Sequence, residues 1–262
     1  MRTYNQEEQW LLTEKFNNLE SEAFQADLVL LHTGTPLAYL IGSIPFLDCV
    51  IHLDSHPLIP RTETEFWTEK AITSIRQSAQ NDKNVKPDSE ELVVGPLRIL
   101  DLCAGSGAIG VAVAKALPTA QVTFGEIDAS HCATIEKNLI ANNIPDARCR
   151  VSQSDLFENI PTTYDYILTN PPYIDPAVDR AEPSVKLHEP SLALYGGVKG
   201  MECIEKIITQ ASAHLTHHGQ LWIEHEPEQS VQVEHLAKNS SFSCTTHKDQ
   251  YDVERYSILV LQ

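Results

Sequence analysis

A short apolar run that turns through glycines into a helix is the feature that most constrains the fold. Residues 98–102 (Arg-Ile-Leu-Asp-Leu) have the composition of a buried parallel strand, and glycines follow at positions 105, 107 and 110. Glycines there let the backbone approach a ligand closely and let the following helix, expected to reach about residue 117, pack on the sheet. Because many ordinary turns share this pattern, it indicates the architecture more strongly than the ligand.

Strand-like and helix-like segments alternate from this strand through His225. Such alternation predicts a parallel, doubly wound sheet. Residues 241–247 and 256–261 have the pattern of two final strands, which we expect to pair antiparallel. A chain of 262 residues with 42% hydrophobic content can bury one substantial core. Apolar residues near helical spacing in 5–32 predict one or two short helices that pack on this core, the alternative being a docking face for a substrate.

The tetrapeptide Asn170-Pro171-Pro172-Tyr173 ends the strand-like run 164–169. Two consecutive prolines cannot donate to a sheet ladder, and they hold the backbone stiff just beyond the strand. The Asn170 side chain and the Pro171 carbonyl offer two acceptors, which suit a planar –NH2 group with two hydrogens. The Tyr173 ring can cover such a flat group. The motif indicates a site for an amide or amino nitrogen, the alternative being a rigid loop without chemistry.

A second candidate site surrounds the glycine turn. Glu126 follows the apolar strand 121–125, where an acid can accept hydrogen bonds from a ribose diol; the alternative is a solvated acid in a turn. Asp101 has two roles that the sequence leaves open, namely anchoring backbone amides of the turn or contacting a cofactor. The phosphate-loop pattern G-x-x-x-x-G-K-S/T is missing, so hydrolysis of a nucleoside triphosphate lacks its usual motif.

Taken in order, these features resemble a class I S-adenosylmethionine-dependent methyltransferase that acts on an amide or amino nitrogen. Three more segments are similar to the peptide chain release factor glutamine methyltransferases: Pro-Leu-Ala-Tyr-Leu-Ile-Gly at 36–42, Leu-Ile-Pro-Arg-Thr-Glu-Thr-Glu at 58–65 and His-Glu-Pro-Ser-Leu-Ala-Leu at 188–194. The resemblance runs from about Pro36 to the C-terminus. It implies a Rossmann-like class I methyltransferase fold, with a seven-stranded, mostly parallel sheet and helices on both faces.

The resemblance also implies the ligands and the site residues. S-adenosylmethionine is the expected methyl donor, S-adenosylhomocysteine the product, and the substrate a glutamine in the Gly-Gly-Gln loop of a release factor. Asp155 is expected to bind the adenine amino group, unless it only caps a loop or helix. The expected cofactor-binding residues are Arg61, Asp101, Ala104, Gly105, Ser106, Gly107, Glu126, Ile127, Asp155, Leu156 and Asn170. The expected catalytic residues are Asn170, Pro171, Pro172 and Tyr173, and the expected substrate-binding residues are Asn170, Pro171, Tyr173 and Glu189.

We expect four parts in the chain: 1–35 as a shortened helical segment, 36–60 as a β-hairpin linker, 61–96 as a helix with a polar insertion, and 97–262 as the methyltransferase domain. The hairpin itself is expected over 39–53, the helix over 62–77, and a linker over 81–91. Three features depart from the family's pattern. Thr62 stands where the family has proline, the segment before Pro36 is short, and 77–95 is inserted.

Charge bears on the class of substrate. The chain has 36 acidic and 19 basic residues, for a formal net charge of −17. Proteins that bind nucleic acid use Lys and Arg to contact phosphates, and a strongly acidic molecule repels DNA and RNA. The balance favours a protein substrate, although acidity can also serve solubility alone. We expect a release factor as partner, no direct contact with nucleic acid or membrane, and a monomer.

Two other functions remain as alternatives. A nucleic-acid amino-methyltransferase of the adenine N6 type would need a basic channel and a target-recognition domain. A catalytically silent, methyltransferase-like binding partner would show an altered glycine turn or a broken Asn-Pro-Pro-Tyr motif. The sequence shows none of these signatures.

Six cysteines without a C-x-x-C pair indicate reduced, mostly buried thiols of a cytosol-like compartment, so we expect a cytoplasmic protein, with the mitochondrial matrix as the alternative. We expect no metal, because residues 224–226 (Glu-His-Glu) lack further ligands at recognisable spacing.

Overall fold

The computed structural model describes residues 4–84 and 95–262, and its main sheet has seven strands in the order β5-β4-β3-β6-β7-β9-β8. Their bounds are β3 Arg98–Leu102, β4 Gln121–Glu126, β5 Cys149–Gln153, β6 Tyr164–Thr169, β7 Leu215–Glu224, β8 Phe242–Lys248 and β9 Glu254–Leu261. Strands β5, β4, β3, β6 and β7 pair in parallel, whereas β9 pairs antiparallel with both β7 and β8. The expected mostly parallel sheet with an antiparallel end is confirmed.

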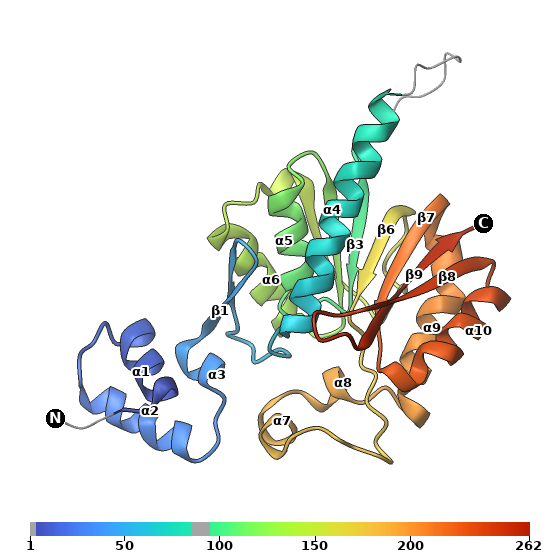
Figure 1. Cartoon of the computed structure of the whole chain (residues 1–262). Helices are drawn as coiled ribbons and strands as arrows, with labels where there is room; N and C mark the ends of the chain where they lie inside the picture. Colours follow the sequence, from blue (N-terminus) through green and yellow to red (C-terminus); the bar gives the residue numbers. More distant parts are fainter. Residues whose placement is uncertain (1–3, 85–94) are drawn as a thin grey trace.

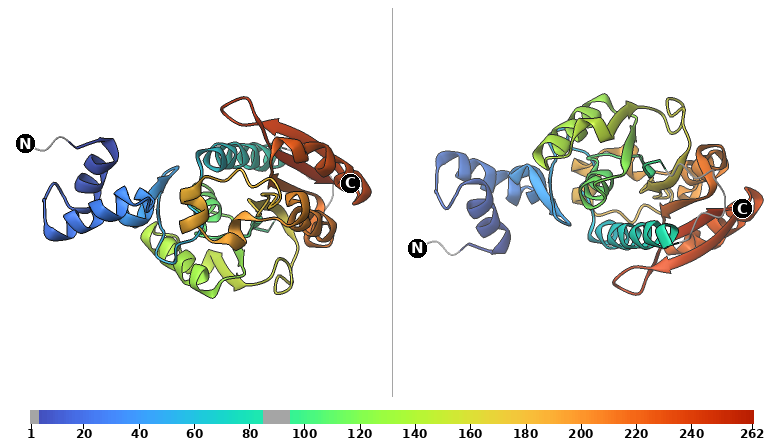
Figure 2. Two further views of the ribbon diagram at one scale, coloured as in Figure 1. Left: turned by 90° about the horizontal axis from the view of Figure 1, so that it is seen from below. Right: turned by 90° about the horizontal axis from the view of Figure 1, so that it is seen from above.

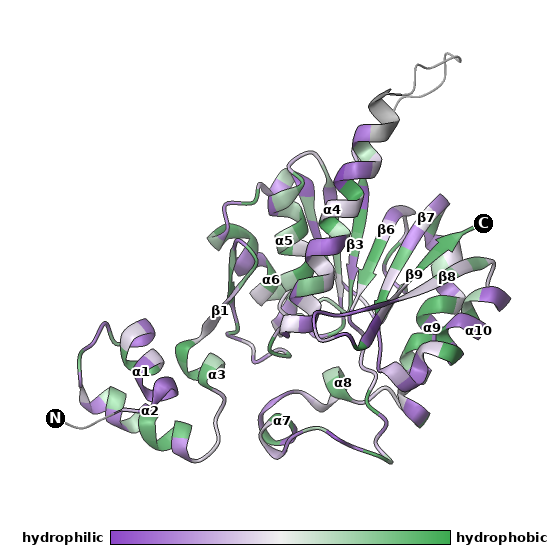
Figure 3. Cartoon of the chain, in the orientation of Figure 1, coloured by the Kyte–Doolittle hydropathy of each residue, from purple (hydrophilic) through white to green (hydrophobic). Residues whose placement is uncertain are grey.

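Helices cover both faces of this sheet (Figures 1 and 2). One face carries α4 (Thr62–Asn84), α5 (Ala108–Ala116) and α6 (Ala129–Ala141), and the other carries α9 (Glu202–Ala211) and α10 (Ser230–Asn239). Successive residues of a strand point to opposite faces of the sheet. Ile99 packs in the hydrophobic core under α4, α5 and α6, whereas Leu100 packs in the core under α9 and α10. Both faces of the inner strand β6 are covered, and in Figure 3 this strand changes from hydrophilic at its start to hydrophobic toward its arrowhead.

The N-terminal helices form a small unit of their own, which Figure 1 shows set apart from the sheet. It contains α1 (Gln6–Trp10), a π-helical turn (Leu11–Lys15), α2 (Glu22–His32) and α3 (Leu37–Ile41). Its buried apolar side chains pack on one another and not on the main core; they are Leu11, Leu12, Phe24, Leu28 and Leu40. The expectation that this segment packs on the core is therefore wrong. The unit also extends beyond residue 35, because α3 contributes Leu40 to it.

A β-hairpin joins this unit to the sheet domain. Strands β1 (Ser43–Phe46) and β2 (Cys49–His52) pair antiparallel, over a shorter stretch than the expected 39–53 because α3 precedes them. Two side-chain amides, one in α6 and one on the residue that follows it, attach β2 to the domain. Asn138 Oδ1 accepts from His52 N at 2.7 Å, and Asn142 Oδ1 accepts from Val50 N at 3.0 Å. Their Nδ2 groups donate to the carbonyls of the same two residues, so one edge of the hairpin is paired with side chains.

The helix expected over 62–77 continues to Asn84 as α4. It therefore takes up the first four residues of the linker expected over 81–91 and much of the insertion at 77–95; residues 85–94 lie outside the described part of the chain. Within residues 4–84 and 95–262, the longer helices are too polar, and the apolar ones too short, for any to cross a membrane.

Gly110 in α5 marks the closest approach of helix and sheet. A Cβ at this position would overlap the Phe124 ring and lie 2.9 Å from Asp101 Oδ2, and both side chains are fully buried. We expect Gly110→Ala to lower the free energy of unfolding by about 2 kcal/mol, because the overpacked core has no room to relax. Urea unfolding followed by tryptophan fluorescence measures this. Gly95→Ala is the matched control, since nothing lies within 4 Å of its added methyl group, and an equal loss in both variants would contradict the packing argument.

Candidate active site

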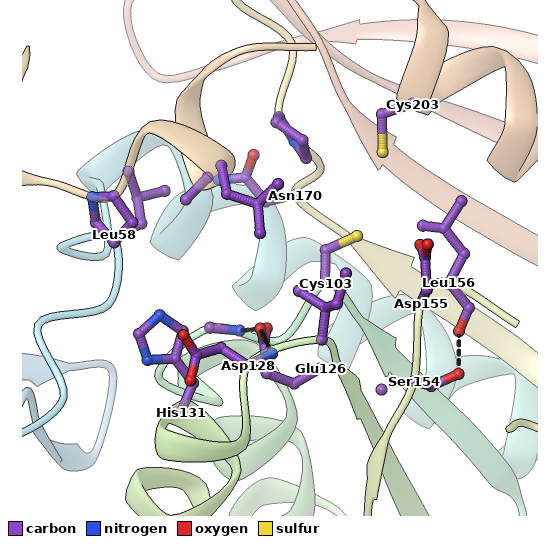
Figure 4. Close-up of a pocket in the computed structure, with 17 residues that line it drawn as sticks. Leu58, Cys103, Glu126, Asp128, His131, Ser154, Asp155, Leu156, Asn170 and Cys203 are labelled. Carbon is purple, nitrogen blue, oxygen red and sulfur yellow. Dashed lines mark hydrogen bonds between the residues drawn. The ribbon is translucent and has the colours of Figure 1, made fainter. Parts of the chain in front are cut away.

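A cavity lies where the parallel strands β3, β4 and β6 end, beside the point at which the strand order reverses between β3 and β6. Ligands bind at this place in open α/β sheets, because adjacent connections run to opposite faces there and leave a crevice. Figure 4 shows the cavity and its walls. The lining residues are Leu58, Cys103, Gly105, Gly125, Glu126, Ile127, Asp128, His131, Ser154, Asp155, Leu156, Asn170, Pro172, Pro190, Leu192, Ala193 and Cys203.

Glu126 lies on the cavity wall at the end of β4, as expected for a ribose acceptor. Its Oε2 accepts from Gly105 N at 2.7 Å and its Oε1 from Asp128 N at 2.9 Å. These two bonds hold the carboxylate in place, and each oxygen keeps one further acceptor site. Gly105 has φ +54°, a conformation that glycine adopts without strain, so the turn brings its N–H directly to the carboxylate.

Asp101 supports the turn from behind. Its side chain is fully buried, and its Oδ2 accepts from Gly110 N at 2.8 Å. Burial raises the pKa of Asp101 well above its ordinary value, against the lowering effect of this hydrogen bond. The anchoring role is thus present, whereas Asp101 does not line the cavity and its contact with a cofactor stays a prediction. The same is true of three other expected residues, which build the turn behind the wall: Ala104, Ser106 and Gly107.

Asp155, Leu156 and Ile127 also line the cavity. Asp155 is exposed, and Leu156 has φ +47°, which turns the chain tightly after β5. The adjacent Ser154 Oγ donates to the Leu156 carbonyl at 2.8 Å and so stabilises this turn. A carboxylate beside two apolar side chains suits a flat heterocycle with an amino group, as expected for adenine.

The amide of Asn170 is oriented by a buried chain of hydrogen bonds. Asn170 Nδ2 donates to Thr64 Oγ1 at 3.1 Å, and Thr64 Oγ1 donates to Glu224 Oε2 at 2.7 Å. Glu224 also accepts from Trp67 Nε1 at 2.6 Å and from the Tyr173 hydroxyl at 2.9 Å. Because the Asn170 nitrogen is engaged on the side of α4, its Oδ1 is left as the acceptor on the other side.

Burial raises the pKa of Glu224, while its three donors oppose this shift. Burial and the neighbouring Glu224 carboxylate raise the pKa of Tyr173 well above its ordinary value, so the phenol stays protonated and donates. The Tyr173 ring is thereby tied to the end of β7.

A second cavity adjoins the first on the far side of Asn170. Of these two cavities, the second alone is lined by Pro171 and Tyr173, the first alone by Pro172, and both by Asn170. Leu58 and Ala193 also line both cavities. The Asn-Pro-Pro-Tyr motif therefore contributes to the walls of two adjoining hollows.

Arg61 and Glu189 form an ion pair with one another. Arg61 Nη2 pairs with Glu189 Oε1 at 2.7 Å, and Glu189 Oε2 accepts from Ile59 N at 3.1 Å. The Glu189 side chain is only 1% exposed, so both of its oxygens hold the chain rather than a substrate. Arg61 lines the second cavity and not the first. The expected contacts of Arg61 with the cofactor and of Glu189 with the substrate stay predictions.

The three sequence segments at 36–42, 58–65 and 188–194 converge on this place. The Tyr39 hydroxyl donates to the Pro57 carbonyl at 2.7 Å, and Glu189 holds Ile59 two residues later. Leu58, which lines both cavities, is thus fixed from both sides. The segments are structural ties that hold one wall of the site.

Sequence reasoning missed Thr64 and assigned Glu224 no role. Thr64 lies on α4, far from the motif in sequence, and its place in the family-like segment 58–65 is the signal that could have identified it. Glu224 ends β7, the neighbour of β6, and its position at a strand end beside the motif is a signal that could have identified it.

The cysteines also differ from expectation: all six are free, but only Cys49 is buried and the other five are half-buried. Across the described ranges, no group of three or more His, Cys, Asp or Glu side chains is arranged to hold a metal ion.

Comparisons with known proteins agree with this geometry. Residues 90–185 match the family model described as the methyltransferase small domain. A release factor glutamine methyltransferase of Lactococcus lactis is 30% identical over 94% of this chain and 84% of its own length. One of Gloeobacter violaceus is 34% identical over 84% of this chain and 72% of its own length. A ribosomal protein uL3 glutamine methyltransferase of Bordetella pertussis is 31% identical over 72% of this chain and 59% of its own length.

Among solved structures, the catalytic domain of human METTL16 with an RNA hairpin superposes with a TM-score of 0.60 at 15% identity, over 81% of this chain and 75% of that chain. At this identity the similarity supports the fold alone, which is that of class I methyltransferases.

Proposed function

Because the chain belongs to the family of release factor glutamine methyltransferases, we propose that it methylates the side-chain amide nitrogen of a glutamine in the Gly-Gly-Gln loop of a peptide chain release factor. The observation that carries this proposal is the place of Asn170 between two cavities. A methyl group has to pass from a donor on one side to a nitrogen on the other, and the Asn170 Oδ1 acceptor lies at that boundary.

The first cavity fits S-adenosylmethionine, which when bound supplies an electrophilic methyl group on its sulfonium. Glu126 has acceptor sites for the ribose hydroxyls, and Asp155 with Leu156 and Ile127 suits the adenine. Gly105, whose backbone approaches the cavity without a side chain, leaves room beside the ribose. The residues present therefore fit the cofactor of the family.

The second cavity takes the glutamine side chain. An amide nitrogen is a poor nucleophile because its lone pair is delocalised into the carbonyl. Asn170 Oδ1 and the Pro171 carbonyl accept its two N–H groups and favour a pyramidal nitrogen, whose lone pair is directed at the first cavity. Both acceptors also stabilise the positive charge that develops on this nitrogen, so they act most strongly in the transition state. Holding the nitrogen close to the donor contributes as well.

Glu224 acts through Thr64 and Tyr173 rather than on the substrate. Its two oxygens are occupied by three donors, and it lies behind the groups that line the second cavity. It therefore fixes which face of the Asn170 amide presents oxygen and where the Tyr173 ring lies. The proton lost from the methylated nitrogen is released to water, and no general base is required.

A ribosomal protein is the second candidate substrate, because one relative is named for glutamine methylation of ribosomal protein uL3. The acceptor pair holds a glutamine amide in either protein, so the choice between them depends on docking outside the cavities. The net charge of −17 disfavours nucleic acid as the substrate in both cases.

The test is methyl transfer from labelled S-adenosylmethionine to a purified release factor. Its matched control is the same factor with Gln→Ala in the Gly-Gly-Gln loop, beside ribosomal protein uL3 and bare duplex DNA. Label on the wild-type factor alone is the expected result. Label on uL3 alone would mean that the same reaction takes place on the ribosomal protein instead of the release factor. Label on DNA would overturn the proposal of a protein substrate.

Thr64→Val is a specific test of how Asn170 is positioned. Valine keeps the shape of this buried side chain but removes the hydroxyl between Asn170 Nδ2 and Glu224, so the amide can rotate. We expect kcat to fall by roughly 10-fold, which corresponds to the contribution of about 1.4 kcal/mol from one hydrogen bond. The affinity for S-adenosylmethionine should not change. Thr64→Ser should restore kcat. Thr68→Val, one turn further along α4, is the control, because its hydroxyl bonds only the Thr64 carbonyl; an equal loss of kcat there would refute the role of Thr64.

A further inference from the structure

Two cysteines meet in the wall of the cofactor cavity. Cys103 directly follows β3, Cys203 is the second residue of α9, and both line this cavity. Figure 4 shows the two sulfur atoms directed toward one another across the cavity wall. Both cysteines are free, and each thiol shifts the pKa of the other. They are 100 residues apart in the chain, so only the fold brings them together.

Cys103 occupies an unusual backbone position. Its φ is +58°, in the left-handed region where residues with a Cβ are disfavoured and glycine is unstrained. Strained positions of this kind cluster at functional sites. A cysteine therefore occupies, in the cavity wall, a backbone conformation that favours glycine.

The two thiols differ in acidity in the way that a reactive pair requires. Hydrogen bonding from the Cys103 thiol lowers the pKa of Cys203, and the positive charge of Lys206 adds to this, while burial and Asp155 act in the opposite direction. The same hydrogen bond and burial raise the pKa of Cys103 well above its ordinary value. Thiols with a lowered pKa and access to solvent are the ones that oxidants attack first, and an adjacent second thiol completes a disulfide.

We propose that Cys103 and Cys203 form an oxidation site, at which hydrogen peroxide converts the pair to a disulfide that closes the cofactor cavity. The Cys203 sulfur attacks one peroxide oxygen and breaks the O–O bond, which yields a sulfenic acid and one water. The Cys103 sulfur then attacks the Cys203 sulfur, forms the S–S bond and expels the hydroxyl group, which leaves as a second water with the Cys103 proton. Both sulfurs are oxidised, and one peroxide is reduced to two waters.

The bond would alter the cavity because both residues form its wall. A disulfide requires the sulfurs to approach to about 2.0 Å, which draws the first turn of α9 toward the end of β3. This inference rests on the proposed function in one respect, that the cavity binds S-adenosylmethionine. We expect the disulfide to weaken that binding at least 10-fold, and bound S-adenosylhomocysteine to slow formation of the disulfide by shielding the pair.

The experiment uses the full chain, reduced and then treated with one equivalent of hydrogen peroxide. Mass spectrometry of a non-reduced digest identifies the crosslinked cysteines. Calorimetry gives the dissociation constant of S-adenosylmethionine before oxidation, after it, and after re-reduction with dithiothreitol. Cys103→Ser and Cys203→Ser are the test variants, and Cys244→Ser on β8, outside the cavity, is the matched control. Each protein is compared only with its own reduced form.

The expected result is a crosslink between Cys103 and Cys203, with a reversible, at least 10-fold loss of affinity in the wild type and in Cys244→Ser only. No crosslink between these two residues, or an unchanged dissociation constant after the crosslink is complete, would overturn the inference. Methyl transfer to the release factor by the reduced protein is measured in parallel. Normal transfer with no effect of oxidation refutes the oxidation site alone. A reversible loss of cofactor binding without transfer to any protein supports the oxidation site and contradicts the proposed substrate.

Discussion

Asn170→Ala is expected to lower kcat for glutamine methylation by roughly 10³-fold, the effect of removing one preorganised group that stabilises developing charge in a buried site. Alanine removes the Oδ1 acceptor between the two cavities, and the Pro171 carbonyl alone cannot hold both N–H groups of the substrate amide. The loss should appear in kcat rather than in the dissociation constant of S-adenosylmethionine, because Glu126 and Asp155, the acids proposed to hold the cofactor, are untouched. Single-turnover methyl transfer together with calorimetry separates the two quantities.

Asn239→Ala is the control for this variant, since Asn239 is an exposed residue at the end of α10. It should retain full activity. Asn170→Ala that methylates the release factor at the wild-type rate would remove Asn170 from the mechanism. A thermal melt of each variant shows whether lost activity reflects lost folding, which we do not expect for a half-buried side chain with one hydrogen bond.

Glu126→Gln is expected to weaken binding of S-adenosylmethionine by roughly 10²-fold. Glutamine keeps the shape of the side chain but loses the charge, and its –NH2 group faces either Gly105 N–H or Asp128 N–H, donor against donor. Hydrogen bonds to a charged acceptor contribute about 1.5–3 kcal/mol, so the loss of one or two to the ribose diol corresponds to this factor. The value of kcat at saturating cofactor should change much less, because the acceptors of the second cavity are untouched.

Calorimetric titration of the variant with S-adenosylmethionine measures the effect. Glu158→Gln is the matched control, because Glu158 is exposed, lies close in sequence to the cavity residue Asp155 and does not itself line the cavity. An unchanged dissociation constant in Glu126→Gln would mean that Glu126 only anchors the glycine turn. A similar loss in Glu158→Gln would point to the net charge of the molecule rather than to a hydrogen bond.

Local patterns predicted the fold well. The strand that contains Asp101 is marked by a nearly continuous apolar run. The turn after it is marked by glycines, which adopt its backbone conformation without strain. Both signals are local in the sequence. The N-terminal helices were also predicted, but their packing was not. Phe24 and Leu28 are apolar at helical spacing whether they face the main core or a separate one, because periodicity shows which face is buried and not against what.

The sequence by itself determined the strands, the glycine turn, the Asn-Pro-Pro-Tyr loop and the place of the acid Glu126 at a strand end, because each depends on residues that are neighbours in the chain. Tertiary structure alone decided which groups orient Asn170, that Glu189 pairs with Arg61, and that Cys103 lies against Cys203. In each of these cases the partners are about 100 residues or more apart, and what a buried polar side chain does depends on the donors and acceptors that the fold places beside it.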